Sequence, residues 1–267
     1  MKLAIPRSSS VLTVRAVQRA LNILTSLGEE DLRLVDLAAR LKLHKATVTR
    51  LLGTLAQADM VSRDEQDRYT LGPGIILLAG RLLGRYRTLA DLLHEPLRRV
   101  WETTRETVTI HVRVGLERLC IEELESPEAI TYRAGVGNRV PIHSGSAGKV
   151  LLAFLPDGER AALLRQLRLV PVTERTITNS SRLIQELDKV RRAGYAVSAG
   201  ERIIGATAVS VPVWDRSGRV VAAVSVLGPE SRLTPEVLKR YAALLKTEIR
   251  PLPMVIPDLA LVHERKG

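Results

Sequence analysis

The chain has 267 residues, a formal net charge of +11 and a sequence pI near 10.3. This length exceeds what one small hydrophobic core occupies, so two domains are favoured over a single large one. The basic balance favours a polyanionic partner, because Lys and Arg near phosphates release counterions, but charge alone does not identify nucleic acid. Aromatic residues make up 3% of the chain, which argues against the base stacking that single-strand binders use.

The cysteine and histidine content argues against stabilisation by disulfide bonds or bound metal ions. Cys120 is the only cysteine, which excludes an internal disulfide and a cysteine-rich zinc cluster. The five histidines show no paired metal-ligand spacing.

The N-terminus lacks the apolar core of a signal peptide, and no later run approaches the roughly 20 apolar residues that cross a bilayer. We expect a soluble cytoplasmic protein with no metal, no cofactor and no membrane partner.

The first predicted elements form a winged helix-turn-helix. Apolar residues from Val14 to Leu24 predict an amphipathic helix that ends near Gly28 and packs across the next two helices. From Leu34 to Leu71 the spacing predicts a helix, a tight turn, a second helix and a two-stranded wing. The residues expected to form its shared apolar wedge are Leu37, Ala38, Leu41, Leu43, Val48, Leu51, Leu52 and Leu55. Arg33 stands where a capping Ser, Thr or Asp is expected before the first of these two helices.

The other face of the second helix carries short and basic side chains suited to phosphates and base edges. This is the pattern of a recognition helix in the major groove, although each residue is also compatible with an ordinary solvated surface. In the wing, Arg63 and Arg68 flank an acidic tip and are better placed for phosphates than the tip itself. The candidate DNA-binding residues are Lys45, Ala46, Thr47, Thr49, Arg50 and Arg68, with Arg50 the strongest.

Glycine and proline at residues 72–74 end the wing, and a linker helix is predicted over residues 75–88. A second amphipathic stretch, residues 91–105, continues it, with Pro96 as the expected kink point. We therefore divide the chain into a DNA-binding domain (1–74), a linker helix (75–89), an effector-binding and oligomerisation domain (90–252) and a C-terminal tail (253–267).

The second domain is predicted to be α+β, with an antiparallel sheet flanked by helices. Alternating residues predict one hairpin, a weaker third strand and a second, central hairpin. These strands are expected at 107–114, 119–123, 131–133, 206–214 and 219–227. Helices are expected at 148–154, 158–168 and 181–193, the last stopped by Gly194, and a final helix begins at Thr234 with a capping hydroxyl.

The small residues between Pro141 and Lys149 lead into a helix and could expose backbone N–H groups to an anion or a carbonyl oxygen. A phosphate-binding P-loop is rejected, because His143 and Val150 occupy places that need Gly and Ser or Thr. No nucleophile elbow or carboxylate partner supports catalysis by His143, so a structural or ligand-orienting histidine is preferred. Cys120 is interpreted as a packing residue.

Five motifs stand in a fixed order between about Thr13 and Leu252. They are LVDLAARLKLHKATVTRLLGTL, DRYTLG, VPIHSGSAGKVLLAF, VRRAGYAVSAGE and VSVPVWDRSGRVVAAVSVLGP. On these motifs the chain resembles the IclR family of bacterial transcriptional regulators. The resemblance implies an N-terminal winged helix-turn-helix, a linker helix, a GAF-like effector domain, and assembly as a homodimer or a dimer of dimers.

The resemblance also implies which residues line an effector pocket. They come from the loop before the 148–154 helix, from the segment after the GY pair and from the strand ending in PV: Ser144, Gly145, Ser146, Ala147, Ser198, Ala208 and Ser210. Many relatives have an acidic residue at the position of Ser198 and a cysteine at that of Ala208. This chain departs from both, so effector identity does not transfer.

The predicted function is a regulator that binds double-stranded operator DNA under the control of a small-molecule effector, an organic or aromatic acid by family expectation. A difference in effector affinity between two arrangements of the dimer would change the spacing of the recognition helices. Repression and activation both remain open. Two alternatives from other classes are a constitutive DNA-binding architectural protein and an enzyme that uses the C-terminal domain.

Overall fold

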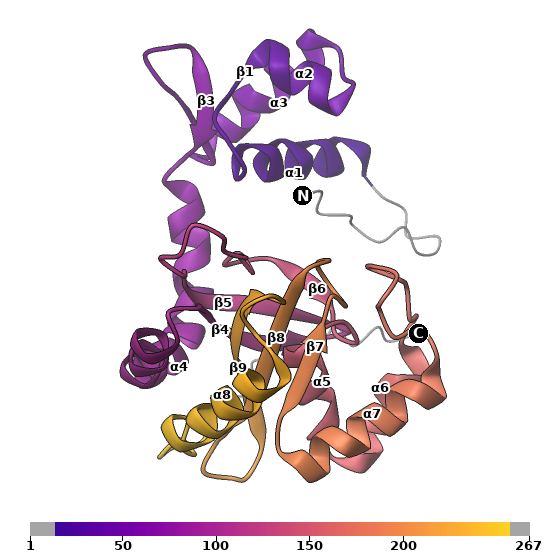
Figure 1. Ribbon diagram of the computed structural model, residues 1–267. Coiled ribbons are helices and arrows are strands. Elements are labelled where there is room, and N and C mark those ends of the chain that lie inside the picture. Colours follow the sequence, from indigo (N-terminus) through magenta and orange to yellow (C-terminus); the bar gives the residue numbers. More distant parts are fainter. Residues whose placement is uncertain (1–13, 257–267) are drawn as a thin grey trace. The chain divides into compact units, whose positions relative to one another are not determined.

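The computed structural model describes residues 14–256, except for the side chains of residues 81–87. Two compact units divide the chain between Gly84 and Arg85, and each has its own hydrophobic core (Figure 1). This mixed architecture confirms the predicted α+β class with an N-terminal winged helix-turn-helix.

The described part of the first unit contains α1 to α3, the start of α4 and a small antiparallel sheet. Its strands are hydrogen-bonded in the order β1-β3-β2. Strand β1 was not predicted, because two residues are too few to show an alternating pattern; it pairs Leu32 with Tyr69. The element bounds are α1 (Arg15–Leu27), β1 (Leu32–Arg33), α2 (Leu34–Leu41), α3 (Lys45–Gln57), β2 (Val61–Arg63) and β3 (Arg68–Leu71).

The predicted apolar wedge between α2 and α3 is confirmed. Leu37, Val48 and Leu52 are almost fully buried in the core of this unit. Helix α1 joins them through its C-terminal half, where Leu24 of the predicted face packs against the core. Ile23 and Leu27, four residues apart, are buried there, whereas the earlier apolar residues are exposed: Val14 (64%), Val17 (56%) and Leu21 (48%). As predicted, Arg33 gives α2 no side-chain cap.

The predicted linker helix and the amphipathic helix after it form one continuous helix, α4 (Gly74–Thr104), with Pro96 inside it. Its second half carries Leu89, Leu93 and Leu97, which are buried in the core of the second unit. These three residues recur at i and i+4 spacing, so one helix face meets the sheet. Arg105, in the left-handed region at φ 56°, follows the end of the helix.

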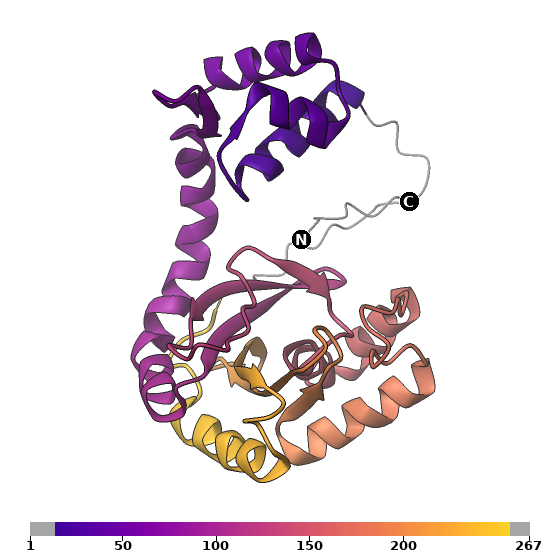
Figure 2. The same cartoon turned by 45° about the horizontal axis from the view of Figure 1, so that its top comes forward.

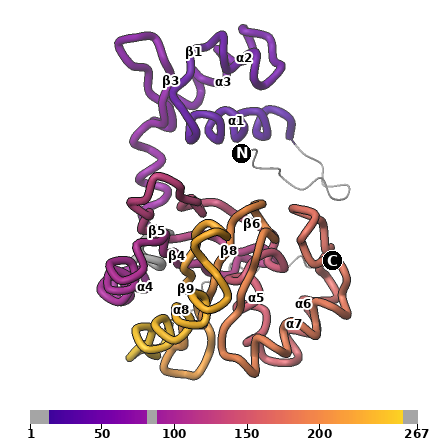
Figure 3. The backbone as a smooth tube through the Cα atoms, viewed as in Figure 1, coloured from indigo at the N-terminus to yellow at the C-terminus, as the bar shows by residue number. Residues whose placement is uncertain are grey.

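The second unit is built on a six-stranded antiparallel sheet with strand order β6-β5-β4-β9-β8-β7. The chain forms β4 to β6, leaves to form three helices, returns through β7 to β9 and ends in α8 (Figure 3). The strands are β4 (Thr107–Val114), β5 (Glu117–Leu124), β6 (Arg139–Pro141), β7 (Ala196–Ala199), β8 (Ala206–Trp214) and β9 (Val220–Pro229). The helices are α5 (Ser146–Ala153), α6 (Asp157–Gln166), α7 (Ser180–Ala193) and α8 (Pro235–Glu248).

Both predicted hairpins are confirmed, and β8 and β9 lie in the interior of the sheet as expected. The predicted strand at residues 131–133 is wrong. That segment is a loop held by the Thr131 hydroxyl, 3.1 Å from that of Thr107, and the strand beside β5 is β6 instead. Helix α7 ends at Gly194 in the left-handed region, and Thr234 caps α8, both as predicted.

The two faces of the sheet differ in chemistry, and this difference positions the pocket. On one face, Val108, Ile110 and Val224 pack with apolar side chains of α4 and α8. The other face is covered by α5, and α7 packs against α5 (Figure 2). On this face an apolar cluster that includes side chains of both helices lies beside polar strand residues, which alternate with the apolar residues of the first face. Thr109, His111 and Ser225 are such residues, and all three are buried. Because side chains alternate along a strand, an apolar core and a polar pocket share the same strands.

Candidate DNA-binding and effector sites

Helix α3 presents the candidate DNA-binding residues on one side of the first unit. Its buried residues Val48, Leu52 and Leu55 hold the other face against the core. Lys45, Ala46, Thr49 and Arg50 are exposed, and Thr47 is half-buried. The Thr49 hydroxyl donates to the carbonyl oxygen of Lys45 at 3.0 Å, so its oxygen remains available to accept a hydrogen bond.

The wing pairs its basic side chains with its own acidic tip. Arg68 Nε lies 2.9 Å from Asp64 Oδ2, and an Arg63 guanidinium nitrogen lies 3.1 Å from Asp67 Oδ1. The backbone N–H of Arg68 also donates to Asp64, which lowers the pKa of that carboxyl. To bind a phosphate, Arg68 must therefore break its ion pair with Asp64 or contact both groups at once. Arg50 differs, because no carboxylate within the described residues pairs with it.

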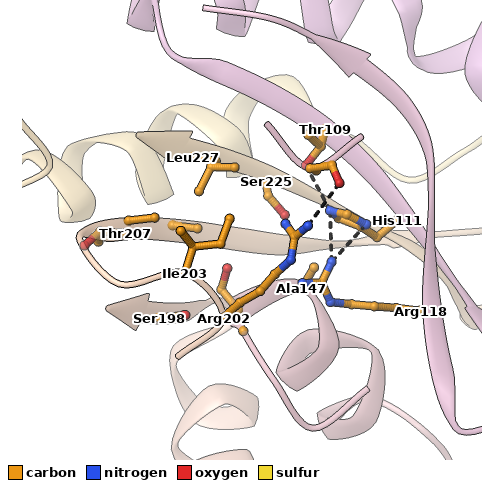
Figure 4. Close-up of a pocket in the computed structure, with 15 residues that line it drawn as sticks. Thr109, His111, Arg118, Ala147, Ser198, Arg202, Ile203, Thr207, Ser225 and Leu227 are labelled. Carbon is orange, nitrogen blue, oxygen red and sulfur yellow. Dashed lines mark hydrogen bonds between the residues drawn. The ribbon is translucent and has the colours of Figure 1, made fainter. Parts of the chain in front are cut away.

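A small buried pocket of about 40 Å³ lies in the second unit, where the N-terminus of α5 meets β4, β8, β9 and the loop after β7 (Figure 4). A volume of this size has room for about one water molecule. Residues that the sequence alone placed in an effector pocket are brought together here. Those that line it are Gly145, Ser146, Ala147, Ser198 and Ala208.

Two other candidates, Ser144 and Ser210, are fully buried but are not among the lining residues. The Ser210 hydroxyl lies 2.7 Å from the hydroxyls of both Ser146 and Ser225, so it links the helix to the sheet. The Ser144 hydroxyl donates to the carbonyl oxygen of Glu201 at 3.2 Å. In this structure these two side chains support the pocket wall.

Sequence reasoning missed the pocket's charged and aromatic groups, Arg118, Arg202 and His111. Arg118 was left between the predicted strands 107–114 and 119–123, although it lies in β5 and is only 4% exposed. Its Nη1 lies 3.1 Å from His111 Nδ1 and 3.2 Å from His111 Nε2. The available signal was alternation, because Arg118 stands two residues before the buried Cys120 on the same strand.

The pocket is electropositive because neither of its two arginines forms an ion pair with a carboxylate of the described residues. Burial, followed by the nearby charge of Arg202, lowers the pKa of Arg118 to about 9 although the charge of Glu201 acts in the opposite direction, so Arg118 stays protonated at neutral pH. Burial followed by the charges of Arg118 and Arg202 holds the pKa of His111 well below its usual value, so this imidazole is neutral. Among residues 14–256, no carboxylate forms an ion pair with Arg118 or Arg202.

His143 and Cys120, which the sequence analysis also considered, have structural roles in the second unit. His143 is fully buried, its Nε2 lies 3.0 Å from the carbonyl oxygen of Val170, and it does not line the pocket. Burial raises the pKa of the Cys120 thiol to about 12, which makes it a neutral packing group. Both positions match the structural interpretation of these residues.

Within residues 14–256, no group of three or more His, Cys, Asp or Glu side chains is arranged to hold a metal ion. The helices of the same part of the chain include none with the length and apolar character needed to span a membrane.

A winged helix-turn-helix unit followed by an α+β unit with a buried polar pocket defines a class of DNA-binding transcriptional regulators. Residues 16–65 match the IclR helix-turn-helix domain, and residues 85–251 match the C-terminal domain described as bacterial transcriptional regulator IclR. The chain belongs to the IclR family.

Relatives and solved structures agree with this assignment. The chain is 32% identical over 244 residues to the regulator KdgR of Escherichia coli K12, covering 90% of this chain and 92% of KdgR. It resembles the crystal structure of Thermotoga maritima IclR with a TM-score of 0.75 at 30% identity, covering 89% and 96% of the two chains. An IclR homolog from Microbacterium hydrocarbonoxydans, solved with 4-hydroxybenzoate, gives a TM-score of 0.68 at 27% identity, covering 88% and 99%. These relatives are regulators, so the chain is classed as a transcriptional regulator and not as an enzyme.

Proposed function

We propose that this regulator binds operator DNA through α3 and the wing, and that a small organic acid in the pocket of the second unit changes its operator affinity. The observation that carries the proposal is a pair of pocket arginines, the buried Arg118 and the half-buried Arg202, beside the N-terminus of α5. Buried cations without carboxylates are costly unless an anion joins them. The first N–H groups of α5 have no intrahelical acceptors and favour the same charge.

The DNA-binding half of the proposal depends on α3. Lys45, Ala46, Thr49 and Arg50 form an exposed row with short and basic side chains, as major-groove contacts require. We assign the roles by the division predicted from the sequence: residues 1–74 bind DNA, residues 75–89 form a linker and residues 90–252 bind the effector.

Self-association is part of the proposal, as a homodimer or a dimer of dimers, because two recognition helices must meet successive turns of DNA. Exposed apolar side chains on two helices support it. Val17 and Leu21 lie on α1, and Ile76, Leu77 and Leu78, which are 65–80% exposed, lie at the start of α4. Large exposed apolar groups that cluster commonly mark protein interfaces.

The test is a metabolite-library thermal-shift screen on the full chain, with each hit retested for its effect on binding to the DNA upstream of its own gene. We expect at least one organic acid that stabilises the protein and changes operator affinity. Operator affinity that no stabilising metabolite alters would favour the constitutive architectural protein instead. The relative with 4-hydroxybenzoate shows only that one homolog takes such an acid.

A further inference from the structure

The two pocket arginines come from different elements that line one small cavity. Arg118 projects from β5, and Arg202 projects from the loop that follows β7 (Figure 4). They are close enough that the charge of Arg202 lowers the pKa of Arg118. Arg118 is buried and Arg202 is half-buried, so their two positive charges repel each other with little screening by solvent and the unliganded pocket is electrostatically unfavourable.

The acids nearest this pair are already committed to other donors. Glu201 accepts from Lys149 Nζ at 2.7 Å through one oxygen and from the Gly145 N–H at 3.2 Å through the other. Glu123 Oε2 accepts the backbone N–H groups of residues 134 and 135, at 2.6 and 2.9 Å. Within the described residues, two positive charges therefore face the pocket, and no carboxylate forms an ion pair with either of them.

The two arginines are held differently. Arg118 contacts both ring nitrogens of His111, and its Nε donates to the carbonyl oxygen of Ser144 at 3.4 Å, so its position is fixed. Its Nη2 lies next to Gly145, where an added Cβ would come within 3.2 Å of that nitrogen. A fixed guanidinium and the N-terminus of α5 therefore meet at one corner of the pocket.

Arg202 has a single hydrogen-bond acceptor in the described part of the chain, the carbonyl oxygen of Ala134 at 3.0 Å. A neutral carbonyl is a weaker partner for a guanidinium than an anion is. The pocket measures about 40 Å³, whereas ligand sites commonly measure roughly 300–1,000 Å³, so we expect a side chain to move when a ligand enters. By moving, Arg202 would break only this one hydrogen bond, whereas Arg118 would break its contacts with His111 and Ser144.

We infer that the effector is a small dianion, with one anionic group held by Arg118 at the N-terminus of α5 and the second held by Arg202. This inference rests on the proposed function, because it takes the pocket to be the effector site. Short dicarboxylates and small phosphorylated acids share the required chemistry. Two charges on the ligand match two arginines that form no ion pair with a carboxylate of residues 14–256, whereas a monocarboxylate leaves Arg202 on the Ala134 carbonyl.

The test compares dianions with monoanions of equal carbon number on the purified full chain by isothermal titration calorimetry. Dicarboxylates of three to six carbons are each paired with the matching monocarboxylate, and phosphoglycolate is paired with glycolate. In at least one pair, the dianion should bind about 10- to 100-fold more tightly, the usual range for one charged hydrogen bond. The pair that shows the preference identifies a carboxylate or a phosphate as the second group. Equal affinities in every pair, or no binding, would overturn the inference.

Variants then assign the second charge to a residue. Arg202→Gln should lower dianion affinity to the level of the matching monoanion and leave monoanion affinity within about threefold, because Arg118 still holds the first group. Arg202→Lys should restore part of the difference. Arg133→Gln is the charge-matched control, because Arg133 is exposed on the neighbouring loop and pairs with Glu125. An equal loss of affinity for dianion and monoanion in Arg202→Gln would contradict the assignment.

Operator binding separates this inference from the proposed function. If a neutral or singly charged metabolite shifts operator affinity while no dianion is preferred, ligand control stands and the dianion inference fails. If a dianion binds through Arg202 and operator affinity stays unchanged, the inference stands and ligand control fails.

Discussion

Lys149 Nζ lies 2.7 Å from Glu201 Oε1, and both side chains are buried, at 1% and 9% exposure. Lys149 also contacts Glu186 Oε1 at 3.0 Å and the carbonyl oxygen of Val197, so its charge is fully partnered. The second oxygen of Glu201 accepts the N–H of Gly145. One carboxylate thus joins the N-terminus of α5 to the loop that carries Arg202.

Breaking this ion pair should destabilise the second unit. Lys149→Met leaves Glu201 buried with only backbone donors, and we expect a loss of about 3–5 kcal/mol in the free energy of unfolding. Lys149→Met/Glu201→Gln should lose less than the sum of the single variants, because the two residues act together. Urea unfolding measures all three. The control is Arg98→Gln, which removes an exposed ion pair with Glu102 and should cost at most ~0.5 kcal/mol. Additive losses would show that the pair is not coupled.

Gly148 allows α5 to approach the preceding loop closely. A Cβ at this position would lie 1.8 Å from the carbonyl oxygen of Ile142, which is backbone and cannot rotate away. Gly148→Ala should therefore lower the melting temperature strongly or prevent folding. Gly158→Ala, in α6, meets no atom within 4 Å and should be neutral or stabilise by up to ~1 kcal/mol, since Ala favours helix. Similar melting temperatures for the two variants would contradict this packing.

His111 should make the stability of the protein depend on pH. Its pKa is lowered in the folded chain, so the unfolded chain takes up a proton below about pH 6.5 that the folded chain does not. The stabilising contribution is complete above pH 6.5 and is lost as the pH falls below it. His111→Gln should reduce the slope of unfolding free energy against pH by up to ~1.4 kcal/mol per pH unit. Urea titrations between pH 5 and 8 measure the slope, and equal slopes for the two proteins would refute the prediction.

Arg50→Ala should weaken operator binding without unfolding the chain, because Arg50 is exposed on α3 and takes no part in the core. We expect a loss equivalent to about 1–3 kcal/mol if it reads a base, or a smaller salt dependence by about one unit of slope if it contacts a phosphate. Footprint titrations at several salt concentrations separate these cases. Arg182→Ala removes the same charge from an exposed position on α7 and serves as the control. Unchanged affinity in Arg50→Ala would remove its assigned role.

The sequence alone was sufficient to predict most of the local elements. The apolar wedge around Leu37 and Val48, both hairpins, Gly194 after α7 and the Thr234 cap were predicted correctly, because each depends on periodicity or on capping within a few residues. The segment at 131–133 was wrong, because strand pairing is decided by a partner elsewhere in the chain, and β5 pairs with β6.

The tertiary structure decided which charged side chains lie together in the pocket. Arg118 and Arg202 are 84 positions apart in the numbering, and no local pattern relates them. The antiparallel sheet turns one face of β4 and β5 toward α5, and the loop after β7 then places the second arginine at the same cavity. Residue spacing therefore determined the DNA-binding helix and the general plan of the chain. The electropositive pocket depends on long-range packing, because the burial of Arg118 and the lack of an ion pair to either arginine among the described residues are properties of the folded chain alone.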